Sequence, residues 1–232
     1  MRRAWRRAGA PLRTRAGGAH LPSGAGRPNL RIGLLGGSFN PAHDGHRHIS
    51  LLALRILGLD EVWWLVSPQN PLKPAKETRP LQERLRRARE VARHPRIRVT
   101  DLEAGFETRY TIDSLRAILR ALPRCRFVWL MGADNLAQIS RWRDWTAIFD
   151  TVPIAVFDRP SYSFSASTGG AARRFGRSCL PERQASMLAD MRPPAWVFLK
   201  TALNPVSATR IRKRHPARGI RAAARRYVGG GF

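Results

Sequence analysis

Short apolar runs that alternate with amphipathic segments constrain the fold of this chain most. Runs of strand length lie at 31–35, 61–66, 97–100, 127–131, 152–157 and 196–199. Segments with apolar residues at helical spacing lie between them, at 47–57, 81–91 and 111–122. The run at 127–131, FVWLM, has no polar residue, as expected of a strand covered on both faces of a parallel sheet. This alternation predicts an α/β fold, a doubly wound and mostly parallel sheet with helices on both faces.

The length and apolar content of the chain fit one globular domain. A chain of 232 residues, of which 43% are hydrophobic, can bury one substantial core. No apolar run approaches the roughly 18 residues that span a bilayer, so we expect no membrane association. Residues 161–178 are rich in serine and glycine and are predicted to form a surface loop. We place the folded domain at residues 30–232.

Residues 1–29 differ in composition from the rest of the chain. They hold seven arginines, no acidic residue and several glycines and prolines. A segment of this kind buries too little apolar surface to fold, so we predict a disordered basic extension. A mitochondrial transit peptide is the alternative, because such peptides are also arginine-rich and poor in acids. Only Thr14 and Ser23 carry hydroxyl groups, and prolines interrupt any amphipathic helix, which argues against it.

The strong positive charge admits two interpretations. The formal net charge is +26, which suits a nucleic-acid partner or small anionic substrates such as nucleotides. The arginines are spread over every segment instead of gathering in one stripe, and no RNA-binding signature is present. We therefore expect no nucleic-acid partner.

The number and spacing of the cysteines indicate in which redox compartment the protein works. Cys125 and Cys179 are the two cysteines, far apart and without C-x-x-C spacing. This pattern argues against a disulfide framework or a zinc site. It indicates a reducing compartment, and we expect a cytoplasmic protein.

A glycine-rich segment connects the first predicted strand to the first predicted helix. It covers residues 36–46 and reads GGSFNPAHDGH. Glycines let the backbone approach a ligand closely, and the first N–H groups of a helix attract anions. His43 and His46 are three residues apart, so on a first helical turn they share one face and can both donate to one triphosphate. The segment predicts a phosphate site; a plain strand–helix connection is the simpler alternative.

The common nucleotide-binding fingerprints are absent from the sequence. Neither G-x-G-x-x-G nor G-x-x-x-x-G-K-[ST] occurs. A dinucleotide-dependent dehydrogenase or a P-loop kinase is therefore unsupported. In a doubly wound sheet, ligands bind beyond the carboxyl ends of the strands, where the strand order reverses. The glycine-rich segment begins at such an end.

Five blocks in a fixed order resemble the nucleotidyltransferase superfamily, and within it the bacterial nicotinate-nucleotide adenylyltransferases. Residues 37–46 match G-x-F-x-P-x-H-x-G-H, and VSATRIR at 206–212 is similar to I-S-x-T-x-I-R. Between them lie WLVSPQNPLK at 64–73, YTIDSL at 110–115, and MGADNL at 131–136 followed by Trp142. The resemblance covers about residues 31–228 and implies a Rossmann-like fold.

The resemblance also implies a reaction. The phosphate of nicotinate mononucleotide attacks the α-phosphorus of ATP and expels pyrophosphate, giving nicotinate adenine dinucleotide. Such an enzyme has to align the substrates and offset negative charge, and it needs no nucleophilic side chain. A Mg²⁺ ion is expected to bridge the ATP phosphates, held by phosphate oxygens and water and not by a dedicated set of protein ligands.

The resemblance assigns catalytic and ATP-binding roles to residues of the first and last blocks. His46 is expected to hydrogen-bond the α-phosphate, His43 to lie further along the triphosphate, and Arg212 to hold the β- and γ-phosphates. The remaining ATP-binding residues are expected to be Gly36, Gly37, Ser38, Phe39, Asp134, Ser207 and Thr209. The role of Asp134, contact with the ribose or positioning of a helix, stays open.

The middle blocks are implied to bind the acceptor. The resemblance places the pyridine ring near Tyr110 and Thr111 and on the face of Trp142, with Lys73 near the acceptor phosphate. Asn40 stands where many members have aspartate, which removes a charge beside the phosphate site.

Three alternatives remain at this stage. Another superfamily enzyme, such as a pantetheine-phosphate adenylyltransferase or a cytidylyltransferase, shares the first and last blocks. Nicotinamide mononucleotide is an alternative acceptor, although we expect strong preference for the acid. A non-catalytic RNA-binding protein is the alternative from a different class.

Overall fold

The computed structural model describes residues 21–22, 25, 27–68, 78–159 and 169–200. The strands are β1 (Arg31–Gly37), β2 (Glu61–Val66), β3 (Ile97–Thr100), β4 (Arg126–Gly132), β5 (Ile154–Phe157), β6 (Cys179–Leu180) and β7 (Trp196–Leu199). The α-helices are α1 (Asp44–Ile56), α2 (Leu81–Ala92), α3 (Leu102–Gly105), α4 (Thr111–Ala121), α5 (Ala133–Gln138), α6 (Trp145–Thr151) and α8 (Gly170–Arg174). The 3₁₀-helices are η2 (Ile139–Arg141), η3 (Gly176–Ser178) and η4 (Glu182–Asp190).

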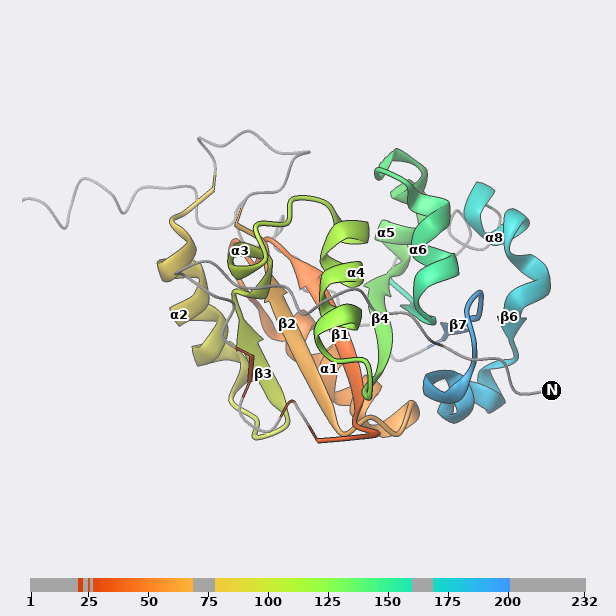
Figure 1. Cartoon of the computed structure of the whole chain (residues 1–232), viewed down its shortest axis with the longest axis horizontal. Coiled ribbons are helices and arrows are strands. Elements are labelled where there is room, and N and C mark those ends of the chain that lie inside the picture. Colours follow the sequence, from red (N-terminus) through yellow and green to blue (C-terminus); the bar gives the residue numbers. More distant parts are fainter. Residues whose placement is uncertain (1–20, 23–24, 26, 69–77, 160–168, 201–232) are drawn as a thin grey trace, which may run out of the picture.

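The described strands form one seven-stranded sheet in the order β3-β2-β1-β4-β5-β7-β6 (Figure 1). Every pair of neighbouring strands is parallel. The chain runs from β1 outward to β3 and then returns to β4 on the other side of β1. The strand order therefore reverses between β1 and β4, which is where ligands bind in folds of this kind.

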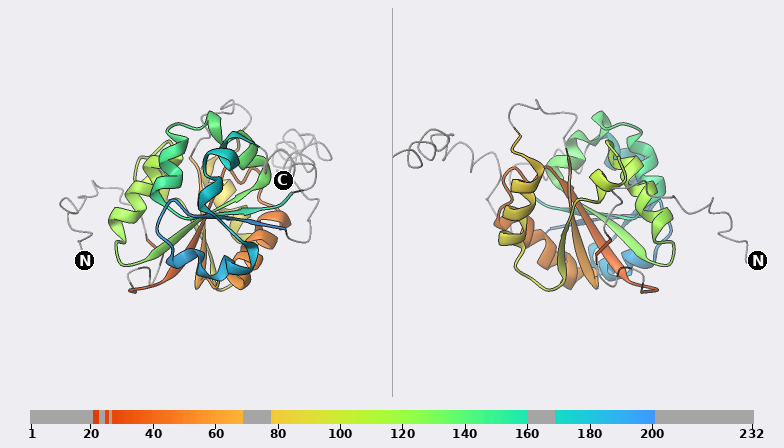
Figure 2. Two further views of the ribbon diagram at one scale, coloured as in Figure 1. Left: turned by 90° about the vertical axis from the view of Figure 1, so that its right-hand side faces the viewer. Right: turned by 60° about the vertical axis from the view of Figure 1, so that its left-hand side comes forward.

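Helices cover both faces of the sheet (Figure 2). On one face, the apolar sides of α4, α6 and α8 pack with side chains such as Trp63, Trp129 and Val156. On the other face, α1, α2 and η4 pack with side chains such as Trp64 and Leu130. The central strands alternate their side chains between these two cores, so both of their faces are buried. The predicted doubly wound fold is confirmed.

The strand and helix bounds differ from the predicted ones in instructive places. β1 continues through Gly36 and Gly37, because both residues pair with β2. β5 begins at Ile154, after α6 ends at Thr151. The short strand β6 was not predicted.

The predicted loop at 161–178 is wrong for its described part. Gly170–Arg174 is helix α8 and Gly176–Ser178 is η3. Ala171, Ala172 and Phe175 are buried, and the Phe175 ring stacks on Phe149 at 4.1 Å between centroids. Small apolar residues let this short helix lie close to the core, which the high content of glycine and serine concealed.

The boundary near residue 29 stays a prediction, because most of the preceding segment lies outside the described residues. Ala25 is buried, and the Cys125 thiol donates to its carbonyl oxygen at 3.3 Å. The backbone N–H of Asn29 donates to the carbonyl oxygen of Arg124 at 2.8 Å. Ala25 and Asn29 thus contact the residues just before β4.

Candidate active site

The predicted site residues that the structure describes lie at the carboxyl ends of the strands. Because all seven strands run parallel, these ends form one edge of the sheet. His43 and His46 follow β1, Asp134 follows β4, and Tyr110 begins the helix that returns to β4. The structure thus brings blocks that are distant in sequence to the point where the strand order reverses.

The two glycines at the end of β1 serve the packing of the sheet. A Cβ atom on Gly36 would lie 2.3 Å from the Trp129 ring, which is closer than any real contact. Gly37 accepts a hydrogen bond from the Ser67 N–H at 3.0 Å and lies against the Phe39 ring. Gly36 is therefore required for β1 to pack beside Trp129, whereas a Cβ on Gly37 would meet the Phe39 ring only at an ordinary contact distance of 3.5 Å.

His43 and His46 close the first turn of α1. His43 is the residue before the helix, and its Nδ1 accepts a hydrogen bond from the Gly45 N–H at 3.1 Å. The Nδ1 of His46 accepts in turn from the His43 N–H at 3.2 Å. Both rings use Nδ1 as acceptor, so the hydrogen of a neutral ring sits on Nε2. For His46, Nε2–H is therefore the donor that the ring can offer to a ligand.

This arrangement corrects one expectation from the sequence. The first N–H groups of α1 were expected to face an anion, but Gly45 N–H is bound to His43 and His46 N–H to the His43 carbonyl oxygen at 2.9 Å. The extended backbone of His43 (φ −154°, ψ 167°) brings its ring over the helix end. The Nε2–H of His46 is thus a donor for a phosphate in place of these two backbone N–H groups.

Three aromatic rings pack around the imidazole of His46. Its ring centroid lies 3.8 Å from that of His43, 4.7 Å from that of Phe39 and 5.8 Å from that of Trp64. Phe39 is buried with φ at +45° and stacks on Trp64 at 5.0 Å. The indole N–H of Trp64 donates to Ser50 Oγ at 2.8 Å, and that hydroxyl donates to the His46 carbonyl oxygen at 2.8 Å. Packing and hydrogen bonds together fix the position of the imidazole.

The surroundings of His46 keep its ring neutral. Burial lowers the pKa of His46 well below its usual range, and the nearby His43 and Arg159 lower it further. The hydrogen bond to the His43 backbone opposes this effect only in part. His46 is therefore a neutral hydrogen-bond donor at physiological pH.

Asp134 pairs with an arginine that sequence reasoning missed. Arg159 follows β5 directly, and its Nη1 lies 3.3 Å from Asp134 Oδ2. Within the described residues, the other carboxylate oxygen of Asp134 is buried without a hydrogen-bond partner. A Cβ atom on Gly132 would lie 2.4 Å from that oxygen and 2.9 Å from Arg159 Nε, so glycine is needed there. The signal was available: Arg159 is a charged residue at the carboxyl end of a parallel strand.

The predicted acceptor residues gather on the opposite face of the sheet. Tyr110 precedes α4, whose first residue is Thr111, and no side chain of the described residues caps this helix. Tyr110 and Trp142 are half-buried and pack against the same core. The guanidinium of Arg143 lies 4.7 Å above the centre of the Tyr110 ring, which ties the segment after η2 to the start of α4.

A buried polar network supports this second region. Glu103 accepts a hydrogen bond from the Ser114 hydroxyl at 2.9 Å, and that hydroxyl lies 2.9 Å from Thr108 Oγ1. Burial raises the pKa of Glu103, against the opposing effect of hydrogen bonds from Ser67 and Ser114. The network joins α3, the first turn of α4 and the end of β2. It left no signal in the sequence, because isolated serines and threonines occur throughout the chain.

Several predicted site residues lie outside the described residues. These are Lys73, Ser207, Thr209 and Arg212. Their assignments stay predictions, and so does the expectation that the first and last blocks share one cleft.

Neither a metal cluster nor a membrane helix is found in the described part of the chain. There, no group of His, Cys, Asp and Glu side chains is arranged to hold a metal ion. No described helix has the length and apolar character to cross a bilayer.

Comparison with known proteins agrees with the resemblance seen in the motifs. Residues 34–214 match the model of the Cytidylyltransferase-like family. The chain is 51% identical over 181 residues to a protein of Cereibacter sphaeroides named probable nicotinate-nucleotide adenylyltransferase, covering 78% of this chain and 95% of that one. A Caulobacter protein of the same name is 50% identical over 185 residues, covering 80% of this chain and 98% of its own.

A solved structure shares the fold. Nicotinic acid mononucleotide adenylyltransferase of Plasmodium falciparum, complexed with NaAD, aligns with a TM-score of 0.60 at 16% identity. The alignment covers 80% of this chain and 83% of that one.

Proposed function

The chain belongs to the Cytidylyltransferase-like family, and we propose that it transfers the adenylyl group of ATP to nicotinate mononucleotide. A phosphate oxygen of the acceptor attacks the α-phosphorus, the bond from that phosphorus to the bridging oxygen breaks, and pyrophosphate leaves. The product is nicotinate adenine dinucleotide. The reaction belongs to NAD biosynthesis, and we place it in the cytoplasm.

One observation carries the proposal. His43 and His46 form an interlocked pair at the point where the strand order reverses, and the Nδ1 of His46 accepts from the His43 N–H, so a neutral His46 ring carries its proton on Nε2 as a donor. Identity of about half over some 180 residues to proteins named for this activity supports the choice of reaction.

The histidine pair suits charge that develops on phosphate oxygens. A neutral Nε2–H stabilises the α-phosphate as it passes through a crowded five-coordinate state, without giving up its proton. Because burial and the nearby cations keep His46 neutral, the donor is present over the whole physiological pH range. His46 is the residue with the largest role in this proposal, and His43 acts further along the triphosphate.

Residues around the pair complete the ATP site. The glycine-rich segment, Gly36 to Phe39, lies beside the nucleotide, and the buried free oxygen of Asp134 accepts from a ribose hydroxyl. Arg159 adds a cation near His46. Arg212, with Ser207 and Thr209, is proposed to hold the β- and γ-phosphates, on the strength of the matched motif alone.

The start of α4 suits the acceptor. The Asp113 N–H at this end donates to the Tyr110 carbonyl oxygen at 3.0 Å, but the N–H groups of Thr111 and Ile112 have no partner among the described residues, and such groups attract a carboxylate. The N–H and hydroxyl of Thr111 are proposed to bind the nicotinate carboxylate, with Trp142 stacking on the pyridine ring and Tyr110 beside it. Lys73 is proposed to lie near the acceptor phosphate.

A Mg²⁺ ion fits this site as a partner of the phosphates. Apart from the exposed Asp44, the side chains that the described residues bring to the β1–α1 end are imidazoles and the Arg159 guanidinium, and neither is a preferred ligand of Mg²⁺. Asp134 offers the single buried carboxylate oxygen that lacks a partner among the described residues. Phosphate oxygens and water would therefore supply most ligands of the ion, which offsets negative charge on the leaving pyrophosphate.

Release of pyrophosphate tests the proposal. Purified protein is incubated with ATP, Mg²⁺ and either nicotinate mononucleotide or nicotinamide mononucleotide. We expect rapid release with the acid and much slower release with the amide. His46→Ala should lower kcat at least about a hundredfold, as loss of other transition-state donors does. His48→Ala, on the same helix, is the matched control and should keep wild-type activity.

The outcomes separate the parts of the proposal. No pyrophosphate from the wild-type protein with either acceptor would refute the reaction. Equal rates with the two acceptors would refute the preference for the acid and leave the adenylyl transfer standing. An unchanged kcat in folded His46→Ala would refute the assigned role of the histidine.

A further inference from the structure

Helix α2 carries one arginine in an unusual position. Arg84 is buried, with 1% of its surface exposed, although α2 lies at the outside of the molecule. Among the described residues, no carboxylate lies within ion-pair distance of it. Burial lowers the pKa of Arg84, yet a guanidinium stays charged in proteins. A buried charge without an acidic partner needs another form of compensation.

Backbone carbonyl groups supply this compensation. Arg84 Nε donates to the Arg79 carbonyl oxygen at 2.8 Å. Its Nη1 donates to the carbonyl oxygens of Ser38 and Ser67, both at 2.7 Å, and its Nη2 donates to that of Pro68 at 2.8 Å. One planar group thus joins the segment after β1, the segment after β2 and the start of α2.

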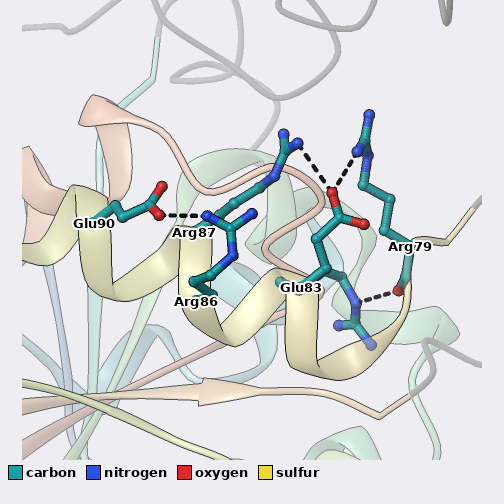
Figure 3. A network of polar contacts seen from close by, with 6 residues as sticks. Arg79, Glu83, Arg86, Arg87 and Glu90 are labelled. Carbon is teal, nitrogen blue, oxygen red and sulfur yellow. Dashed lines mark hydrogen bonds and ion pairs between the residues drawn. The ribbon is translucent and has the colours of Figure 1, made fainter. Parts of the chain in front are cut away.

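Three arginines close to Arg84 in sequence, Arg79 before the helix and Arg86 and Arg87 within it, form ordinary ion pairs (Figure 3). Arg79 and Arg87 both pair with Glu83, at 2.5 and 3.0 Å, and Arg86 pairs with Glu90 at 2.6 Å. The Arg86 side chain is 62% exposed. Exposed pairs of this kind contribute little to stability. Glu83 and Glu90 thus pair with the exposed arginines, whereas Arg84 is bound by backbone carbonyl groups.

The segments that Arg84 joins are those to which the two substrates are assigned. Ser38 lies in the glycine-rich segment beside ATP, immediately before Phe39, which packs against His46. Ser67 hydrogen-bonds Glu103, which accepts from Ser114 in the first turn of α4, where the acceptor is proposed to bind. The reaction requires the attacking oxygen of the acceptor phosphate to lie in line with the bond that breaks at the α-phosphorus. The distance between these segments therefore matters for kcat.

We propose that Arg84 is a positioning residue that holds Ser38, beside the ATP site, and Ser67 and Pro68, beside the acceptor region, at a fixed separation. The inference rests on the proposed function. A lysine keeps the charge, but it has no planar fork and cannot reach carbonyl groups in separate directions at once. Arg84→Lys should therefore bind both substrates and align them poorly.

Steady-state kinetics of Arg84→Lys and Arg84→Gln test this inference. We expect kcat at saturating ATP and nicotinate mononucleotide to fall at least about tenfold in both variants. Each KM should change less than about threefold, since each segment keeps its own contacts. Arg86→Lys is the matched control on the same helix and should keep the wild-type kcat. Every variant is assayed well below its own unfolding midpoint, so that loss of the fold is not mistaken for a loss of kcat.

Each result decides the matter. If Arg84→Lys keeps the wild-type kcat, or if only a KM changes, Arg84 does not set the alignment. If neither variant unfolds cooperatively at any temperature, Arg84 is required for folding and the positioning role is refuted. An inactive wild-type protein would instead refute the proposed function, which separates the two failures.

Discussion

Two helices begin at the carboxyl edge of the sheet, and their first turns are built in opposite ways. The start of α1 is closed by its own residues, since His43 and His46 accept hydrogen bonds from the backbone around them. The start of α4 has no side-chain cap among the described residues, and it contacts Arg143, which is distant in sequence. The first end holds the His46 imidazole in a fixed geometry, and the second leaves the N–H groups of Thr111 and Ile112 without a partner among the described residues.

This difference separates two kinds of binding. Groups locked by packing and hydrogen bonds can stabilise a transition state, because they need no rearrangement when charge develops. Free N–H groups at a helix end suit recognition of a carboxylate, which is the same before and after the reaction. We therefore expect changes at α1 to act on kcat and changes near α4 to act on the KM of the acceptor.

The largest effect is expected at His43, where two variants separate its role in catalysis from its role as the helix cap. His43→Ala should lower kcat about a hundredfold and also destabilise the fold by about 1 kcal/mol, because the helix cap is lost. His43→Asn keeps an acceptor for the Gly45 N–H, so it should lose the same activity with nearly wild-type stability. Kinetics and urea unfolding of both variants check this. Equal stability loss in the two would contradict the role of His43 as a cap.

A smaller effect is expected at Arg159. Arg159→Gln removes the cation that lies near His46 and pairs with Asp134. We expect kcat to fall about tenfold, as a charge next to the phosphates is lost. Because Arg159 lowers the pKa of His46, that pKa should rise in the variant, which NMR titration of the imidazole would detect. A falling pKa would contradict the electrostatic contact.

A change at the proposed acceptor site should alter the KM for nicotinate mononucleotide. Trp142→Ala should raise the KM for nicotinate mononucleotide about tenfold, in line with about 1–1.5 kcal/mol for a lost aromatic stack. The KM for ATP and kcat should change less than about threefold. Trp142→Phe keeps an aromatic face and should lie close to wild type. If Trp142→Ala changes kcat instead, the proposed division between α1 and α4 fails.

The smallest expected effect is the contribution of His46 to the pH dependence of folding stability. The pKa of His46 in the folded state lies well below 6.5, whereas in the unfolded chain it takes its ordinary value. Below about pH 6.5 the unfolded chain therefore binds more protons than the folded one, and stability falls as the pH falls. The thermal midpoint should drop less between pH 7.5 and pH 5.5 in His46→Gln than in the wild type. An equal drop would contradict the lowered pKa.

Local patterns predicted most of the framework but not the contacts that set the site. The apolar runs and the helical spacing identified β1 to β5 and β7, because the strands are buried on both faces. The match of the glycine-rich segment to a known motif identified the histidines. Neither pattern could show that Gly36 is needed against Trp129, since that contact depends on how β1 and β4 pair.

In a chain this basic, the sequence could not show which arginines have a structural or binding role. Arg84, Arg86 and Arg159 look alike in the sequence, yet Arg84 binds backbone carbonyls, Arg86 pairs with Glu90, and Arg159 pairs with Asp134. The difference arises from burial and from partners far away in the chain, which a local pattern does not contain. The helix at 170–174 was missed for the same reason, because its burial depends on Phe149 and its neighbours.

A structure of the protein with a non-hydrolysable ATP analogue and Mg²⁺ tests the central claim most directly. The account predicts that an oxygen of the α-phosphate lies about 3 Å from His46 Nε2, the usual length of such a hydrogen bond. The triphosphate should cross the edge of the sheet between β1 and β4. A triphosphate bound elsewhere, with both imidazoles of the pair facing solvent, would contradict the account.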